Sequence, residues 1–297
     1  MNLKLVRRVL GPLIILATIA VFLHYMSQHP AIWHQVRTTP LPVLFGLVLL
    51  YAGWFLTLMI VMQVSLRIYG RSMPAQENFL LNAYSTLVNF FGPGQSGPAV
   101  RGAYLRTKHR LRVKDYLFTM LLYYAFYVVI SAFFLFAGSQ AWWRTLLVVA
   151  MASAACFFGL RRFARQKHIG EDKPQLTPAH LGWLFFATAL QALLQVVIYF
   201  VEIHQVQAHV TFAQSVTYTG AANFALFVAL TPGAIGIRES FLLFTRKLHH
   251  IGSGTIVAAN VIDRAAFIVF LGVLFVFVLS MHAKDKLRVR ETQSEQQ

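Results

Sequence analysis

The chain has 297 residues, of which 57% are hydrophobic and only 12% are charged. Soluble domains carry roughly 25% charged residues, so this composition excludes a water-soluble fold. The formal net charge of +16 is high enough for a nucleic-acid-binding protein, but the basic residues lie in the segments between long apolar runs, which argues against a nucleic-acid partner.

Six apolar segments are long enough to cross a bilayer as helices. A spanning helix needs about 20 apolar residues for a hydrocarbon core of about 30 Å, and each backbone amide in lipid must be paired within its own segment. We therefore predict an all-α fold, a polytopic bundle of transmembrane helices that forms one membrane domain over residues 1–297. The predicted spans are residues 9–26, 43–66, 116–137, 141–160, 181–201 and 255–281.

The two ends of the chain are expected to stay in the cytoplasm. Basic residues precede the apolar run 9–26 as in a signal peptide, but no small-x-small cleavage site follows, so we expect an uncleaved helix. Twenty Lys and Arg lie before residue 9 and in 67–114, 161–173 and 284–290, whereas only Arg37 and Arg144 lie in the alternate loops. This positive-inside bias predicts a multi-pass protein of the cytoplasmic membrane, with 286–297 as a disordered cytoplasmic tail. The same charges could also attract anionic lipid.

Two further segments, 75–115 and 210–250, carry a Pro-Gly-x-x-Gly break inside an apolar helical run. Proline removes a backbone donor and glycine permits positive φ, so such breaks need protein or a water-filled cavity around them. Interrupted segments in corresponding halves are typical of inverted-repeat transporters, and two independent proline kinks are the alternative. Two re-entrant hairpins would leave six spans, whereas a full double crossing by one segment would make eight.

The sequence also predicts where helices restart and end beside these breaks. In the first segment, Ser96 or Gly97 is expected to cap a new helix that has Pro98 at its first position. In the second, the new helix is expected to end in the basic turn 246–250, with Gly252 just beyond it.

Polar side chains recur at helical spacing near both breaks and on two spans. Either they hydrogen-bond neighbouring helices, worth about 0.6 kcal/mol per contact, or they line a polar groove. The four sets are Asn82, Ser85, Thr86 and Asn89; Ser215, Thr219 and Asn223; Gln191, Gln195 and Glu202; and Asn260, Asp263 and Arg264.

Charged residues in the apolar segments need partners or water, since each costs at least ~2.5 kcal/mol at the bilayer centre. We predict that Glu239 pairs with Arg264, which leaves Arg101 and Arg238 available to an anion. Arg101 is expected in the first turn after the break, where free amides and the helix dipole favour a phosphate. Ordinary positive-inside placement is the alternative for Arg101.

Motifs for enzyme chemistry were sought, and the chain has no phosphate-binding loop, no Gly-x-Ser-x-Gly, no His-Glu-x-x-His and no cysteine cluster. We therefore expect no catalytic residue, no metal site and no cofactor. Energy for any transport would have to come from an ion gradient, a partner or the gradient of the substrate itself.

Three motifs resemble the signatures of the lysylphosphatidylglycerol synthase transmembrane region, also called the flippase-like family. They are Pro93-Gly94-Gln95-Ser96-Gly97 followed by Arg101; Pro232-Gly233-Ala234-Ile235-Gly236-Ile237-Arg238-Glu239; and Asp263-Arg264. The second is close to the family's Pro-Gly-Gly-Leu-Gly-Val-Arg-Glu. The first has Gln95 and Pro98 where Arg and Glu are common in the family. The likeness extends over nearly the whole chain.

The resemblance implies a translocator of a phospholipid or lipid-linked headgroup. In two-part members of the family, a separate cytoplasmic domain transfers lysine from charged tRNA to phosphatidylglycerol. We expect no such domain in this chain, so a lysyltransferase name would be inherited from the family. The alternative function is a non-transporting scaffold for a lipid- or glycan-modifying membrane enzyme.

The expected partner is therefore a membrane lipid with an anionic or zwitterionic headgroup. Its contacts are expected from arginines, amides and the glycines of the two breaks. The candidate substrate-binding residues are Arg101, Arg238, Arg264, Glu239, Asn82, Asn89, Gly94, Gly97, Asn223, Gly233, Gly236 and Gln195.

Overall fold

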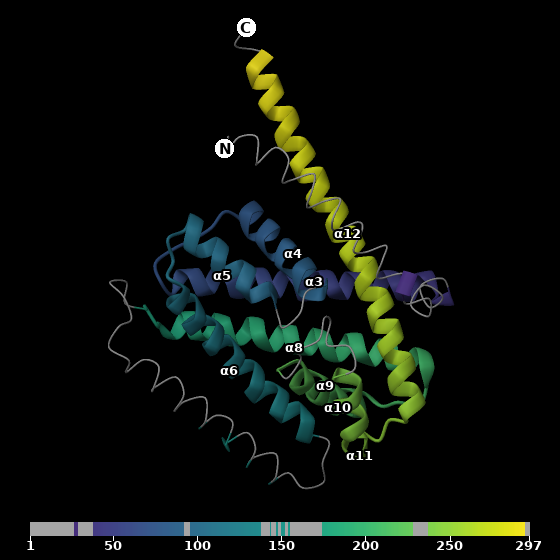
Figure 1. The fold of residues 1–297 in the computed structure, drawn as a ribbon. Helices are drawn as coiled ribbons and strands as arrows, with labels where there is room; N and C mark the ends of the chain where they lie inside the picture. The colour runs from purple at the N-terminus through teal and green to yellow at the C-terminus, as the bar shows by residue number, and fades with distance from the viewer. Residues whose placement is uncertain are drawn as a thin grey trace.

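The computed structural model describes residues 38–91, 96–137, 174–227 and 237–294, together with a few single positions elsewhere, and side chains as far as residue 281. Every regular element in these ranges is a helix, as predicted for an all-α bundle (Figure 1). The helices are α3 (Leu41–Arg67), α4 (Ala75–Phe91), α5 (Ser96–Lys108), α6 (Val113–Ala137), α8 (Pro178–Val206), α9 (Phe212–Phe227), α10 (Ile237–Phe244), α11 (Arg246–His249) and α12 (Ser253–Ser294).

Four of these helices are long and apolar enough to cross a membrane: α3, α6, α8 and the Ser253–Met281 part of α12. The shortest of them, α6, has 25 residues. At 1.5 Å per residue such a helix extends about 37 Å, more than the hydrocarbon core. The four helices confirm the spans predicted at 43–66, 116–137, 181–201 and 255–281. The spans predicted at 9–26 and 141–160 lie outside the described residues.

Helices α3 and α8 lie side by side at the centre of the bundle and run in opposite directions (Figure 1). The backbone N–H of Gln175 donates to the carbonyl of Ile68 at 2.7 Å, which holds the start of α8 beside the end of α3. Helix α12 packs across both. The connection before α4 and the residues just before α8, from Pro174 on, therefore share one end of the bundle.

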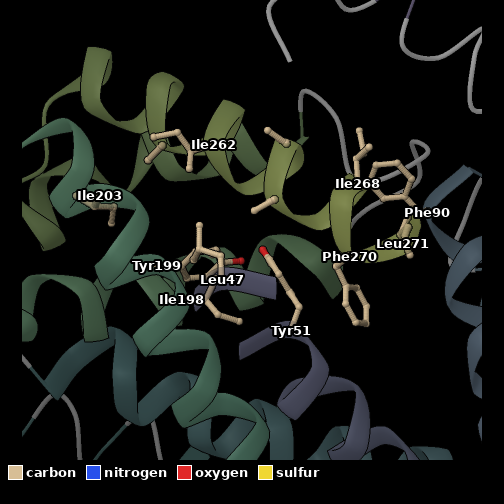
Figure 2. Packing of buried hydrophobic residues seen from close by; sticks show 14 of the residues in the cluster. Leu47, Tyr51, Phe90, Ile198, Tyr199, Ile203, Ile262, Ile268, Phe270 and Leu271 are labelled. Atoms are coloured by element: carbon tan, nitrogen blue, oxygen red, sulfur yellow. The ribbon is translucent and has the colours of Figure 1, made fainter. Parts of the chain in front are cut away.

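Aromatic and branched side chains fill the junction of α3, α8 and α12 (Figure 2). The ring of Tyr51 stacks on Phe270 with centroids 5.9 Å apart and meets Phe267 edge-on at 5.0 Å. Ile198 and Tyr199 of α8 close the same junction, and both are almost fully buried. This packing fixes the direction of the Tyr51 side chain, which matters for the site described below.

The first broken segment forms two arms, α4 and α5, that begin and end at the same end of the bundle. Glu77, near the start of α4, lies 3.2 Å from Lys108 Nζ and accepts a hydrogen bond from the Tyr104 hydroxyl at 2.9 Å. Both partners lie near the end of α5. Arg71, before α4, donates to the carbonyl of His109, just after α5. The segment is therefore a hairpin, and neither arm is among the helices long and apolar enough to cross a membrane, which favours re-entry over a double crossing.

The start of α5 lies directly against the end of α4. The Gly97 N–H donates to Asn89 Oδ1 at 3.1 Å, and Ser96 Oγ donates to an α4 carbonyl at 2.9 Å. A Cβ atom on Gly97 would lie 2.7 Å from the Ser85 carbonyl oxygen, so this close approach requires glycine. The predicted restart of the helix is confirmed, but α5 begins earlier than expected, at Ser96, so Pro98 is its third residue and not its first. The Ser96 hydroxyl bonds α4 and does not cap α5.

The second broken segment, from α9 to α11, also returns to the end at which it starts. Tyr218 of α9 meets His249 of α11 edge-on, with ring centroids 5.4 Å apart. Thr255 Oγ1 donates to Gln207 Oε1 at 2.9 Å, so the connection before α9 lies beside the start of α12. This segment is a second re-entrant hairpin.

The end of this hairpin differs from the sequence prediction. The helix expected to run into the basic turn is divided at Thr245 into α10 and α11. The left-handed residue that ends α11 is His250, with φ 56°, and not Gly252. The N–H of His250 bonds the Arg246 carbonyl at 2.8 Å, so a tight turn closes two residues earlier than the glycine signal indicated.

The two hairpins enter the bundle from opposite ends, because one follows the end of α3 and the other follows the end of the antiparallel α8. This is the inverted arrangement that the paired breaks predicted. In its described residues neither hairpin contains a helix long and apolar enough to cross a membrane, which favours six spans over eight.

Candidate polar site inside the helix bundle

A line of polar side chains follows one face of α8. Gln191, Gln195, Tyr199 and Glu202 recur at intervals of three or four residues, which places them on one side of the helix. All but Gln195 are at most 2% exposed. At 1.5 Å per residue the line extends about 16 Å, roughly half of a hydrocarbon core.

The N-terminal half of this line, Gln191 and Gln195, is hydrogen-bonded to α6 and α9. The Tyr123 hydroxyl donates to Gln191 Oε1 at 2.8 Å. The Tyr127 hydroxyl lies 3.0 Å from Gln195 Oε1 and 2.9 Å from Asn223 Oδ1. Neutral groups of three helices therefore form two hydrogen-bonded sets, which adjoin through the rings of Tyr123 and Tyr127 and which we call together the neutral network.

The C-terminal half of the line, Tyr199 and Glu202, lies beside a buried ion pair. Arg238 of α10 lies 2.6 Å from Asp263 of α12, and the two side chains are 9% and 11% exposed. Arg238 Nε also donates to Asn260 Oδ1 at 2.8 Å, and the guanidinium lies over the ring of Tyr199. The Tyr199 hydroxyl in turn accepts from Gln195 Nε2 at 3.1 Å, so the ion pair and the neutral network are continuous. Pairing of this kind is what charges in an apolar bundle require.

Tyr51 of α3 brings a second carboxyl group to this cluster. Its hydroxyl lies 2.5 Å from Asp263 Oδ1 and 3.3 Å from Glu202 Oε1. Glu202 is 1% exposed. In Figure 2 the hydroxyls of Tyr51 and Tyr199 point toward the same space between the helices. We call Tyr51, Tyr199, Glu202, Arg238, Asn260 and Asp263 the charged cluster.

A second ion pair lies beside the charged cluster. Arg264 lies 2.6 Å from Glu239, which confirms the predicted pair. Consecutive residues of α10, Arg238 and Glu239, thus pair with consecutive residues of α12, Asp263 and Arg264. The expectation that Arg238 stays available to an anion is wrong, because Asp263 is its partner.

Arg101 lies apart from the charged cluster, on α5. Since α5 begins at Ser96, Arg101 is in the second turn and not the first as expected, so the free amides of the first turn do not flank it. Its Nε is buried and, among the described residues, has no hydrogen-bond partner; the same holds for the hydroxyl of Tyr116. Arg101 also lies within electrostatic reach of Tyr123 and Tyr124. It therefore faces α6 near the Tyr123 end of the neutral network.

The other predicted site residues are divided between two places. Gln195, Asn223, Glu239 and Arg264 belong to the network or lie beside it. Asn82 instead donates to the Asn78 carbonyl of its own helix at 2.9 Å. Asn89 and Gly97 hold the two arms of the first hairpin together. Outside the described residues lie Gly94, Gly233 and Gly236.

Five residues of the charged cluster were not among the predicted site residues: Tyr51, Tyr199, Asn260, Asp263 and Glu202. Glu202 and Asp263 did carry a signal, because each is an acidic residue at helical spacing from other polar groups. Tyr51 carried none, since one tyrosine in an apolar helix usually serves packing or the membrane interface. Its role depends on where α12 crosses α3.

Within the described ranges, no group of three or more His, Cys, Asp or Glu side chains is placed to hold a metal ion. The side chains of the site themselves offer hydrogen bonding, ion pairing and proton exchange.

Comparison with known proteins identifies one family. The sequence model described as the lysylphosphatidylglycerol synthase TM region matches residues 8–275. Among curated proteins no match was found.

Proposed function

Because this chain belongs to the family of the lysylphosphatidylglycerol synthase TM region, we propose that it moves a phospholipid or a lipid-linked headgroup between the leaflets of the cytoplasmic membrane. The family and the four apolar helices make it a multi-pass membrane protein associated with lipid handling. The observation that carries the finer proposal is the line of polar side chains from Tyr123 to Glu202, set between two hairpins that enter from opposite ends. From Tyr127 onward these side chains are linked to Glu202 by successive hydrogen bonds and the Arg238–Asp263 ion pair.

The network supplies what a headgroup needs in a bilayer interior. A polar group that leaves water must find hydrogen-bond partners, or it costs several kcal/mol. The hydroxyls and amides of α6, α8 and α9 are neutral and both donate and accept, so they can exchange partners with a passing headgroup.

Arg101 is the proposed contact for the headgroup phosphate. Its Nε lacks a partner among the described residues, and a guanidinium meets phosphate oxygens as a bidentate fork. The Arg238 and Arg264 guanidinium groups are already paired, so their contacts with a headgroup would require those ion pairs to open.

The proposal includes orientation and partners. We place both termini and the Arg101 end of the bundle in the cytoplasm, on the positive-inside argument. The binding partner is the headgroup of an anionic or zwitterionic lipid, and the chain itself performs no covalent step.

A membrane scaffold is the second candidate, and one observation favours it. Thr219 and Ser215 are fully buried, and Thr219 Oγ1 donates to the Ser215 carbonyl of its own helix at 2.7 Å. Polar side chains satisfied within their own helix can be buried in tight helix packing and need no groove. On this account the basic end of the bundle would bind a lipid- or glycan-modifying enzyme.

Leaflet exchange in proteoliposomes separates the two candidates. Vesicles of phosphatidylethanolamine and phosphatidylglycerol would carry a trace of headgroup-labelled fluorescent phosphatidylglycerol, and an impermeant quencher would be added outside. A translocator exposes the inner-leaflet label, and exchange no faster than in empty vesicles supports the scaffold.

Arg101→Ala tests the proposed phosphate contact in the same vesicles. We expect exchange to slow by about ten- to a hundredfold, because a hydrogen bond to a charged group contributes about 1.5–3 kcal/mol. Arg106→Ala, an exposed arginine on the same helix, is the matched control and should exchange at the wild-type rate. Equal rates in the two variants would remove Arg101 from the proposal.

A further inference from the structure

The charged cluster holds two carboxyl groups but only one guanidinium. Asp263 pairs with Arg238 at 2.6 Å. Arg264 is engaged by Glu239 at the same distance. Glu202 has no guanidinium of its own: its hydrogen-bonding neighbours are the Tyr51 hydroxyl and the Asp263 carboxyl group, and it is 1% exposed. An ionised Glu202 would therefore leave one uncompensated negative charge inside the bundle, which is unfavourable in a low-dielectric interior.

The hydrogen atoms of the cluster lead to the same result independently. The Tyr51 hydroxyl has one hydrogen and lies within hydrogen-bond distance of both Asp263 Oδ1 and Glu202 Oε1. Ionised carboxylates only accept, so the hydroxyl can donate to one of them and must accept from the other. Asp263 has the shorter contact and the guanidinium, so it is the acceptor. Glu202 must then carry a proton, which it can donate to the Tyr51 oxygen or to the neighbouring Asp263 carboxylate.

We propose that Glu202 is a proton-binding site of this protein. When Glu202 loses its proton, the Arg238 side chain, which otherwise pairs with Asp263 alone, moves to a position between the Asp263 and Glu202 carboxylates. The proton leaves for water as H⁺ and returns from water to Glu202 Oε1, with no other bond made or broken. Arg238 lies at the start of α10, next to the second break, so a change in its partner would shift that hairpin arm relative to α8. That this shift is coupled to lipid movement rests on the proposed function. The proton site itself is argued from the cluster alone and does not depend on that function.

In the described ranges, the titratable neighbours of Glu202 come from four other helices. Tyr51 faces it from α3, Tyr218 from α9, Arg238 from α10 and Asp263 from α12, and Tyr199 lies one turn away on α8. A further titratable group, the buried imidazole of His249 on α11, lies behind Tyr218 and is bonded to the Leu242 carbonyl at 3.1 Å. Within this described shell Arg238 is the cation that an ionised Glu202 would meet.

The nearest exposed backbone to Glu202 along α8 lies at one end of the bundle. Glu202 lies four residues before the end of α8 at Val206, and the following Gln207 is exposed. The site is thus about 6 Å along the helix from the connection that joins α8 to α9. Exchange is expected from this end, which the positive-inside argument places outside.

Infrared difference spectroscopy of the full chain in lipid nanodiscs tests the proton site without any transport. At neutral pH the wild type should show the carbonyl stretch of a neutral carboxylic acid, and Glu202→Gln should lose it. Glu77→Gln, the same substitution at an ion-paired glutamate outside the cluster, should retain it. A wild type without the band, or a band that persists in Glu202→Gln, would overturn the proposal.

Two further measurements keep the test informative if Glu202→Gln folds poorly. Tyr51→Phe leaves the acid but removes the Tyr51 oxygen as acceptor, so the band should remain and shift in frequency; an unshifted band contradicts the geometry. Spin labels on the exposed positions Ser240 of α10 and Val197 of α8 should report a distance change on raising the pH in wild type, and none in Glu202→Gln. A pH-independent distance in wild type would overturn the proposed turn of Arg238, whatever the outcome of the leaflet-exchange assay.

Discussion

At the scale of residues, two adjacent ion pairs join α10 to α12: in one the cation belongs to α10, and in the other it belongs to α12. Arg238 and Glu239 face Asp263 and Arg264, so each charge is balanced by a neighbour on the other helix. Truncation of one partner leaves a buried charge without compensation, whereas replacement of both partners by apolar side chains removes the problem.

Asp263→Ala should therefore lower the free energy of unfolding by about 3–5 kcal/mol. The double variant Arg238→Met with Asp263→Leu should lose clearly less, because neither charge remains. Titration of unfolding in mixed micelles, followed by circular dichroism, measures both values. Arg106→Ala is the surface control and should stay within about 0.5 kcal/mol of wild type. If the double variant were no more stable than Asp263→Ala, uncompensated charge would not explain the loss.

At the scale of elements, helix α9 approaches α6 more closely than any side chain would permit. A Cβ atom on Gly220 would lie 2.3 Å from the backbone nitrogen of Leu135 and 2.8 Å from the carbonyl oxygen of Ser131. Small residues at such crossings let helix backbones pack in membranes. The second hairpin is therefore held against α6 by backbone contact.

Gly220→Ala should destabilise the protein by about 1–3 kcal/mol, since the added methyl group forces α6 and α9 apart. Gly272→Ala is the matched control: it also lies in a helix, and its Cβ would meet no atom within 4 Å. That variant should be neutral or slightly more stable, because alanine favours helix. Thermal unfolding in detergent measures both, and equal midpoints would contradict the close approach.

The base of the first hairpin should respond to pH. Burial raises the pKa of Glu77, but hydrogen bonds from His109, Tyr104 and Lys108 outweigh it and hold the pKa below its ordinary value. A lowered folded-state pKa gives stability that is present above the unfolded pKa and is lost as pH falls through the folded one. Hydrogen exchange at the end of α5 should therefore accelerate only on acidification below the ordinary range of glutamate. Glu77→Gln should show fast exchange at all pH values; a pH-independent wild type would exclude this role.

At the scale of the whole molecule, the bundle has two ends that labelling can distinguish. On a Cys156→Ala background, cysteines at Gln207 and Ser253 should react with an impermeant reagent added outside, since these positions share one end. A cysteine at Arg110 should be protected, because it lies at the basic end. Labelling of Arg110 with protection of Gln207 would invert the proposed orientation.

The sequence predicted those features that a bilayer imposes. Long uncharged runs must be helices of spanning length, so four spans were placed within a few residues of their observed bounds. The pair Glu239 and Arg264 was also predictable, because two opposite charges in lipid must find each other. The paired breaks predicted the opposed hairpins, since proline and glycine cannot continue a helix there.

Features that depend on how helices cross were not predictable. Asp263 competes with any anion for Arg238 because α10 lies against α12. No local sequence pattern predicts this contact between the two helices. Tyr51 became part of the charged cluster through the crossing of α3 and α12. The left-handed turn fell at His250 and not at the glycine, because α11 is too short to reach Gly252.

The path of the headgroup is the central claim, and photolabelling tests it most directly. Phosphatidylglycerol with a photoreactive group on its headgroup would be added to the protein in nanodiscs, illuminated, and the modified peptides identified by mass spectrometry. We expect labelling around Tyr123 and Tyr127 of α6 and between Gln191 and Glu202 of α8, reduced by unlabelled lipid. Labelling confined to lipid-facing positions such as Trp183 and Phe186, with none in the network, would contradict the account.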